Sequence, residues 1–296
     1  MFRGSIVALV TPFDAEGVLD EQALARLVEW HVEQGTHGIV PCGTTGESAT
    51  LTFEEHQRVV EVVVEAAARR LKVIAGSGSN STAEAIDLTR HARAAGADAA
   101  LLITPYYNKP TQEGLYRHHA AIARAVDIPQ ILYNVPGRTV VNMQPETVER
   151  LAAFDNIVAI KEATGSIAAT GEIIRRCGER MAVISGDDFS NLGLLAMGAV
   201  GWISVTANII PADLSAMYRA WEAGDLARAR ELHYAMIELH NAMFIETSPI
   251  PVKTALAIMG RVEHSLRLPL CDLSPASLKS LRAAMADYGL LKECTA

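Results

Sequence analysis

The sequence predicts an α/β protein built on a closed (β/α)8 TIM barrel, with a helical appendage at its C-terminal end. Eight short apolar runs follow one another at intervals of roughly 20–30 residues, and each precedes a longer amphipathic segment. The runs lack a clean polar–apolar alternation, which is typical of parallel strands covered by helices. Eight such units fit a barrel of about 200–250 residues. A doubly wound open sheet is the alternative, but "GSGSNS" at 76–81 lacks the third glycine of its phosphate-binding fingerprint.

The predicted strands occupy the first 208 residues. In order, they lie within "GSIVALVTPF" (4–13), "GIVPCGTTGE" (38–47), "KVIAGSGSN" (72–80), "AALLITPYYN" (99–108), "PQILYNVPGR" (129–138), "NIVAIKEATG" (156–165), "MAVISGDD" (181–188) and "GWISVTAN" (201–208). Between them, apolar residues at helical spacing predict helices, for example over 20–35 and 52–70. After residue 208 the pattern is mainly helical, and only its first helix is needed to close the eighth unit. We therefore expect the barrel, with the active site, over 1–224 and the appendage over 225–296.

Composition and charge narrow the range of partners. The chain has 296 residues, half of them hydrophobic, and a formal net charge of −8. This charge argues against nucleic acid or an anionic membrane as the main partner, although a pocket can still bind a small anion. No stretch approaches the roughly 20 apolar residues that span a membrane. The cysteines Cys42, Cys177, Cys271 and Cys294 are scattered and form no CxxC pair, so we interpret them as reduced thiols of a cytoplasmic protein.

Polar side chains gather where the predicted strands end. In a (β/α)8 barrel these ends and the loops that follow form the active-site face. Lys161 is the only lysine among these residues. The others, in chain order, are Thr44 and Thr45, Tyr106 and Tyr107, Tyr133 with Arg138, Gly186, and the segment "SVTAN" after the eighth strand.

Lys161 stands at the end of an apolar strand, where an ammonium group is costly. Burial disfavours the charged form and should lower the pKa of this lysine, which leaves a neutral amine able to attack a carbonyl and form a Schiff base. A structural lysine paired with Glu162 or another acid, or a side chain that reaches the solvent at the rim, explains the strand equally well. The strand alone does not decide between these interpretations.

The residues at the neighbouring strand ends favour a catalytic role for Lys161 over a structural one. The phenol of Tyr133, with the hydroxyl of Thr45, offers a route for the protons that Schiff-base formation must move. The glycine-rich "GTTGE" at 43–47 offers backbone N–H groups to a carboxylate, and Arg138 offers a bidentate partner for a second one. Taken singly, a packed tyrosine, a tight turn and an exposed loop arginine would be the ordinary explanations.

The motifs "GTTGES", "YNVPGRT" and "AIKEATG", with "GSIVALVTPF" and "TSPIPVK" at the two ends, resemble the dihydrodipicolinate synthase (4-hydroxy-tetrahydrodipicolinate synthase) family of Schiff-base pyruvate aldolases. The resemblance covers nearly the whole chain. It implies a lyase that condenses pyruvate with L-aspartate β-semialdehyde in diaminopimelate and lysine biosynthesis. It also implies a homotetramer made of two tight dimers, with neither a metal nor an organic cofactor.

The resemblance implies a role for each residue of the motifs. Lys161 would form the Schiff base, Tyr133 would relay protons with Thr45, and Tyr107 would complete the relay from the neighbouring subunit. The residues implied to bind substrate are Thr44 and Thr45 for the pyruvate carboxylate, Gly186 and Ile203 along its pocket, and Arg138 for the carboxylate of the semialdehyde.

Two other functions remain open from the sequence. A Schiff-base lyase of the same superfamily acting on sialic acid or a 2-keto-3-deoxy sugar acid is one, although such lyases do not generally carry the arginine of "PGRT". A non-catalytic binding protein on an inherited barrel is the other, but such a protein usually loses part of the set Lys161, Tyr133 and Thr45.

The resemblance also implies a site at which lysine acts as an effector. Its matching residues are Ser48, Ala49, His56, Asn80, Glu84 and Tyr106. Phe53 stands where some strongly regulated relatives carry a histidine, so we expect weaker inhibition than in those relatives. Three other polar groups are interpreted as structural, with no metal bound. They are His118 with His119, His233 with His240, and Asp187 with Asp188, the last as a cap of the next helix.

Overall fold

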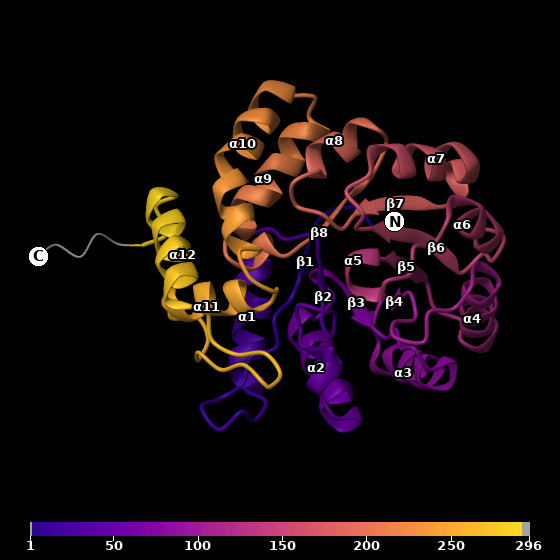
Figure 1. Ribbon diagram of the computed structural model, residues 1–296, viewed down its shortest axis with the longest axis horizontal. Coiled ribbons are helices and arrows are strands. Elements are labelled where there is room, and N and C mark those ends of the chain that lie inside the picture. Colours follow the sequence, from indigo (N-terminus) through magenta and orange to yellow (C-terminus); the bar gives the residue numbers. More distant parts are fainter. Residues whose placement is uncertain (1, 292–296) are drawn as a thin grey trace, which may run out of the picture.

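A computed structural model describes residues 2–291 and confirms the predicted barrel. Eight parallel strands pair in chain order, and the first pairs with the last to close the sheet (Figure 1). The strands are β1 Gly4–Ala8, β2 Gly38–Val40, β3 Lys72–Gly76, β4 Ala99–Ile103, β5 Gln130–Asn134, β6 Ile157–Glu162, β7 Ala182–Ser185 and β8 Gly201–Ser204. Each strand is shorter than the run that predicts it. After β1, for example, Leu9, Val10 and Phe13 lie in the following loop but are still buried. The apolar run in the sequence is therefore longer than the strand, because part of the loop is buried as well.

Helices surround the barrel (Figure 1). They are α1 Glu21–Glu33, α2 Phe53–Ala67, α3 Thr82–Ala95, α4 Gln112–Ala125, α5 Pro136–Thr139, α6 Pro145–Leu151, α7 Ile167–Cys177, α8 Asn191–Ala196, α9 Pro211–Glu222, α10 Leu226–Met243, α11 Ile250–Ile258 and α12 Pro275–Asp287, with short 3-10 turns η1 Ser48–Thr50, η2 Gly178–Arg180 and η3 Thr206–Asn208. Helix α2 begins with a capping box between Thr52 and Glu55, which satisfies two backbone N–H groups at its start. Helix α5 was not predicted, because four residues are too few to show a helical period.

One cluster of apolar side chains, to which all eight strands contribute, fills the barrel interior. The strand register places Tyr133 of β5 beside Lys161 of β6, and Lys161 beside Ile184 of β7. Since side chains alternate across a strand, Ala159 and Lys161 point inward while Ile160 and Glu162 point toward the helices. The register therefore brings the candidate lysine and tyrosine to the same level of the barrel.

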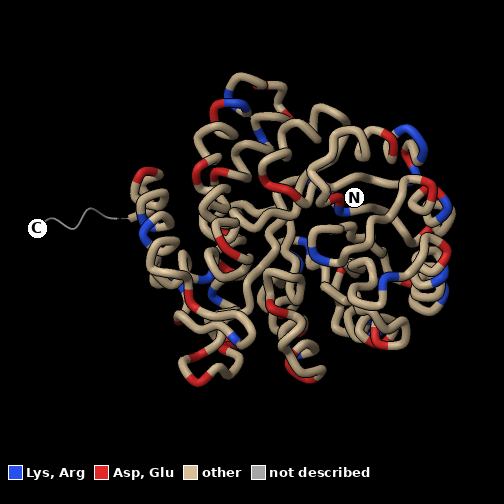
Figure 2. Tube along the Cα trace, viewed as in Figure 1, with Lys and Arg blue, Asp and Glu red and all other residues tan. Residues whose placement is uncertain are grey.

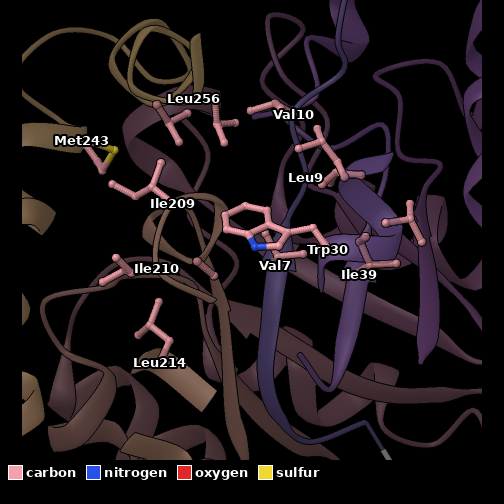
Figure 3. Close-up of a cluster of buried hydrophobic side chains, with 14 of the residues drawn as sticks. Val7, Leu9, Val10, Trp30, Ile39, Ile209, Ile210, Leu214, Met243 and Leu256 are labelled. Carbon is pink, nitrogen blue, oxygen red and sulfur yellow. The ribbon is translucent and has the colours of Figure 1, made fainter. Parts of the chain in front are cut away.

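The C-terminal helices share a core with the barrel. Leu256 of α11 and Met243 of α10 lie in one cluster with Val10 and Ile209, which follow β1 and β8 (Figure 3). Helix α10 packs along α9, and α12 packs on α10 and α11 (Figure 1). The boundary predicted at 224 stays a prediction, and the last five residues of the predicted appendage lie outside the described residues.

Charged residues of both signs are interspersed along the outer helices (Figure 2). Arg176, for example, pairs with Glu146 and Glu149 of α6 and with Glu172 of α7. Within residues 2–291, no helix is long and apolar enough to cross a membrane. The thiols of the described cysteines, Cys42, Cys177 and Cys271, are free, and Cys294 lies outside the described residues.

Candidate active site

Lys161 and Tyr133 form the centre of the site. Lys161 is buried, with 6% of its surface exposed, and its Nζ lies 4.2 Å from the centre of the Tyr133 ring. The face of an aromatic ring is electron-rich and stabilises a nearby cation only modestly. In the part of the chain that the structure describes, Lys161 Nζ has no carboxylate partner and no hydrogen bond. The side chain is therefore held in place by packing, with its nitrogen available.

Glu162 does not pair with Lys161, so that interpretation of the lysine is wrong. Its side chain points to the outer face of the strand and is fully buried there. One oxygen of Glu162 accepts a hydrogen bond from Asn134 Nδ2 at 3.0 Å, and the other accepts from the backbone N–H of Thr164 at 2.8 Å. The carboxylate thus holds the loops after β5 and β6, which begin directly at the site.

Gly186 makes room for the lysine. A Cβ on Gly186 would lie 2.9 Å from Lys161 Cε, 3.1 Å from Lys161 Cγ and 2.7 Å from the Cβ of Ala163. Carbon atoms that are not bonded pack best at about 3.5–4.0 Å. Glycine is therefore required at the end of β7 because the side chain of Lys161 passes directly over its backbone.

The loop 43–48 presents two consecutive backbone N–H groups that are free to bind an anion. Backbone N–H groups of Gly46 and Glu47 donate to the carbonyls of Gly43 and Thr44, both at 3.1 Å, which closes the loop on itself. Within the described residues, the N–H groups of Thr44 and Thr45 donate to no protein acceptor. Neighbouring backbone donors of this kind suit a carboxylate.

The far end of this loop is tied to the C-terminal helices through an ion pair that the sequence analysis missed. Glu47 and Lys253 of α11 are both fully buried, and Lys253 Nζ lies 2.5 Å from Glu47 Oε1. The second oxygen of Glu47 accepts from the backbone N–H of Arg267 at 3.2 Å. The available signal was a single lysine within the otherwise apolar "IPVKTALAI" (250–258), the same kind of anomaly that marks Lys161.

Arg138 lies on α5, directly after β5, and its Nη2 donates to the backbone carbonyl of Ser248 at 2.9 Å. It lines a cavity of about 300 Å³, together with Thr44 and Tyr133. Lys161 lies against the Tyr133 ring rather than directly on this lining. The other lining residues are Cys42, Gly43, Glu47, Ser48, Ala49, Thr50, Gly76, Gly78, Leu101, Ile103, Tyr106, Thr139, Thr247, Ser248, Pro249, Pro269 and Leu270.

The remaining predicted site residues fall into two groups. Thr45 and Ile203 are buried, Thr45 in the loop after β2 and Ile203 in the barrel interior. Among the described residues, the hydroxyls of Thr45 and Tyr133 are not hydrogen-bonded to each other, so the proton relay stays a prediction. Tyr107 is 92% exposed, so its ring is not packed within its own barrel, and its backbone is left-handed (φ 70°).

A second cavity of about 180 Å³ adjoins the first, and Ser48, Ala49 and Tyr106 line both. His56, Glu84 and Phe53 also line it, while Asn80 is not part of its lining. His56 Nε2 lies 2.8 Å from the carbonyl of Gly76, and burial lowers the pKa of this histidine although that hydrogen bond opposes the shift. Five of the six residues predicted for the effector therefore meet at one cavity.

The histidine pairs are packed into the structure. Burial lowers the pKa of His118 to about 4 and holds the pKa of His119 well below its usual range. His240 Nδ1 lies 2.8 Å from Thr206 Oγ1. Within residues 2–291, no group of three or more His, Cys, Asp or Glu side chains could hold a metal ion.

Asp187 and Asp188 have different roles. Asp187 accepts a hydrogen bond from the backbone N–H of Ser190, the residue before α8, but no side chain of the described residues caps α8 itself, so the predicted capping role is wrong. Asp188 instead accepts from the backbone N–H groups of Val205 and Thr206, so it fastens the loop after β8.

The comparison with known proteins agrees with this geometry. The model of the dihydrodipicolinate synthetase family matches residues 1–287. A 4-hydroxy-tetrahydrodipicolinate synthase of Thermodesulfovibrio yellowstonii is 58% identical over 292 residues, covering 99% of this chain and 100% of the relative. The chloride-inhibited dihydrodipicolinate synthase of Acinetobacter baumannii, solved with pyruvate, is 50% identical with a TM-score of 0.96 over 98% of this chain and 100% of its own. The enzyme of Cyanidioschyzon merolae with lysine bound is 42% identical, with a TM-score of 0.95 over 98% and 99% of the two chains.

Proposed function

The chain belongs to the dihydrodipicolinate synthetase family, and from this premise we propose that it is a 4-hydroxy-tetrahydrodipicolinate synthase that joins pyruvate to L-aspartate β-semialdehyde. The observation that carries the proposal is Lys161, a buried amine with no carboxylate partner in the described chain, packed on Tyr133. Groups suited to two carboxylates, the loop 43–48 and Arg138, line the cavity beside it. Both substrates carry a carboxylate, so the cavity matches them in charge.

The chemistry starts at Lys161 Nζ. The amine attacks the C2 carbonyl of pyruvate, water leaves, and a Schiff base forms. Loss of a proton from the methyl carbon gives an enamine, which attacks the aldehyde carbon of the semialdehyde. The amino group of the second substrate then attacks C2 and displaces Lys161, so that the ring closes and the enzyme is regenerated. The overall reaction releases one water and needs no oxidant or reductant.

The protons in these steps need a carrier near C2. Tyr133 fits this role because its ring lies against Lys161 Nζ, which places the phenol beside the reacting atoms. We assign Thr45 and Tyr107 to the same relay, Tyr107 acting in the site of a neighbouring copy. The exposure of Tyr107 supports this assignment, because a side chain packed within its own barrel would be covered.

Reductive trapping tests the central step. Borohydride added with pyruvate should fix a pyruvate-derived group on Lys161, identified by peptide mass, and a Lys161→Arg variant should not be labelled. Lys72 is a matched internal control, because it is exposed and paired with Asp98 and should stay unmodified. Lack of any label on Lys161 would refute the proposal.

Arg138 distinguishes the synthase from a lyase of sugar acids. An Arg138→Ala variant should raise KM for the semialdehyde by about 10-fold or more, because the substrate carboxylate loses its cationic partner. Trapping with pyruvate alone should change little. Efficient cleavage of sialic acid or 2-keto-3-deoxy sugar acids by the wild type, without condensation of the semialdehyde, would favour the lyase instead.

Mixing two inactive variants tests the role assigned to Tyr107 and the homo-oligomer that it requires. Tyr107→Phe and Lys161→Arg chains should each have low activity alone. In a mixed oligomer, a site with an intact Lys161 receives Tyr107 from its partner, so co-expression should restore part of the activity. No recovery in mixed oligomers, verified by two different affinity tags, would show that Tyr107 does not act between copies. Sedimentation of the wild type should show the tetramer that we expect.

We also propose that the second cavity binds lysine weakly. Glu84 lines it and offers a carboxylate to the α-amino group, while His56 and Tyr106 supply further polar atoms. Phe53 lines the same cavity with an apolar ring, which lowers the expected affinity. Calorimetric titration should detect binding at millimolar lysine, and Glu84→Gln should abolish it. Absence of heat in the wild type at that concentration would refute the effector site.

A further inference from the structure

We propose that Glu47 and Lys253 are positioning residues that hold the loop 43–48 in its anion-binding shape. The inference rests on the proposed function, because it gives this loop the task of binding the carboxylate of pyruvate. Neither residue touches the reacting atoms. Their effect passes through the backbone hydrogen bond from Glu47 N–H to Thr44 O, and from there through the peptide unit that links Thr44 to Thr45.

Glu47 is fixed at every polar group. Its carboxylate accepts from Lys253 Nζ and from the backbone N–H of Arg267, at 2.5 and 3.2 Å. Its carbonyl accepts from the backbone N–H and the Oγ1 of Thr50, both at 3.0 Å, and its own N–H donates to Thr44 O at 3.1 Å. The backbone is left-handed at this residue, with φ of 52°. A conformation that is unfavourable for a residue with a side chain persists only when its surroundings hold it.

The hydrogen bond from Glu47 N–H to Thr44 O sets the direction of the donor that we assign to pyruvate. A peptide bond is planar and trans, so its carbonyl and its N–H point in opposite directions. Thr44 O and the N–H of Thr45 belong to one peptide unit. Fixing the carbonyl on Glu47 therefore aims the N–H of Thr45 away from the loop, where it has no acceptor in the described chain.

An ion pair between Glu47 and Lys253 orients the loop in a way that an apolar contact could not. A well-packed apolar pair of the same volume is often as stable as a buried ion pair, so stability alone gives little reason to keep two charges here. A charged hydrogen bond has a defined direction, which an apolar contact lacks. Burial lowers the pKa of Lys253, and the carboxylate of Glu47 opposes that shift. Lys253 Nζ also lies 4.3 Å from the centre of the Phe13 ring.

The same C-terminal segment also holds Arg138, the second carboxylate-binding group of the site. Arg138 donates to the carbonyl of Ser248, and Lys253 lies on α11 five positions later. The segment 248–253 thus contacts both the loop 43–48 and Arg138. It fixes the separation between the two groups assigned to the two substrates.

Three variants test the inference. Glu47→Gln replaces one of the two accepting oxygens with an NH2 group, which must face a donor on either Lys253 or Arg267. Lys253→Met removes the cation and leaves the carboxylate buried. The double variant E47Q/K253M removes both charges and should recover much of the thermal stability that each single variant loses. The control is Leu281→Ala, which opens a cavity at a buried position of α12 and removes no hydrogen bond or ion pair.

Positioning predicts a result that lost stability does not. We expect the pyruvate concentration that half-saturates the enzyme to rise about 10-fold or more in all three variants, including the restabilised double variant. This concentration is measured as KM and, independently, from the concentration dependence of borohydride trapping. The kcat at saturating pyruvate should stay within about threefold of the wild type, and Leu281→Ala should keep the wild-type KM. A double variant that recovers both stability and KM, or a control that shows the same rise in KM, would overturn the inference. If borohydride traps no pyruvate on the wild type, the proposed function fails and the inference fails with it. If pyruvate is trapped on the wild type and the variants need no higher pyruvate concentration for half-saturation, the inference alone fails.

Discussion

The replacement Gly186→Ala should disable the site without removing any functional group. The new Cβ would lie 2.7 Å from Ala163 Cβ and 2.9 Å from Lys161 Cε, where about 3.5–4.0 Å is needed, so both Ala163 and the lysine must move by roughly 0.5–1 Å. A misplacement of about 1 Å costs on the order of 100-fold in rate when a reaction depends on geometry. We therefore expect kcat/KM to fall about 100-fold, with a matching fall in the rate at which borohydride traps pyruvate on Lys161.

The same substitution should also destabilise the fold, since overpacking a core costs about 1–3 kcal/mol. Gly193→Ala in α8 is the matched control, because a Cβ there would meet nothing nearer than Ile167 Cδ1 at 4.0 Å. That variant should keep full activity. Full activity of Gly186→Ala at an unchanged melting temperature would show that the close approach of Lys161 to this backbone is wrong.

Three further predictions follow from buried groups. Asp188→Asn should lower the denaturation midpoint measured in urea, because hydrogen bonds to a charged group contribute about 1.5–3 kcal/mol each and Thr206 alone donates two. Burial raises the pKa of the Cys42 thiol, so iodoacetamide should modify the exposed Cys271 and leave Cys42 intact in the native protein, as peptide mass would show. Burial lowers the pKa of His31 to about 3, so only the unfolded chain binds this proton between about pH 6.5 and pH 3. The neutral His31 therefore leaves the free energy of unfolding at its full value above pH 6.5, and below that pH the free energy falls by about 1.4 kcal/mol per pH unit. In a His31→Gln variant, the free energy of unfolding measured by urea titration should fall less steeply as the pH is lowered.

The architecture could be predicted because the eight units repeat the same local rule. Each apolar run ends at a polar residue, and helical spacing resumes shortly afterwards, so no long-range information is needed to count the units. The position of the site follows from the same rule. Strand ends of a parallel barrel meet on one face, which is why Thr44, Tyr133 and Lys161 could be grouped before their distances were known.

Other features depend on contacts that a local pattern does not contain. Helix α5 has four residues and begins with a proline, so it shows no helical period, yet it carries Arg138. Asp188 is adjacent to a helix in sequence, which suggested a cap, but apart from the side chain of Asn191 its partners lie 17 and 18 residues later on another loop. The partners of these side chains are set by the tertiary structure, and a local sequence pattern does not contain that information.

The two buried lysines show most clearly where local sequence stops being informative. "VAIKE" and "IPVKT" surround Lys161 and Lys253 with apolar residues, and the cost of burying an ammonium applies equally to both. The difference lies in the partner. The acid that pairs with Lys253 is Glu47, 206 positions earlier, whereas the acid adjacent to Lys161 points to the opposite face of its strand. A paired lysine is fixed and charged, and an unpaired one keeps a nitrogen that can react. The same anomaly in sequence therefore marks an anchor in one place and a nucleophile in the other, and the fold assigns the roles by deciding which carboxylate each lysine reaches.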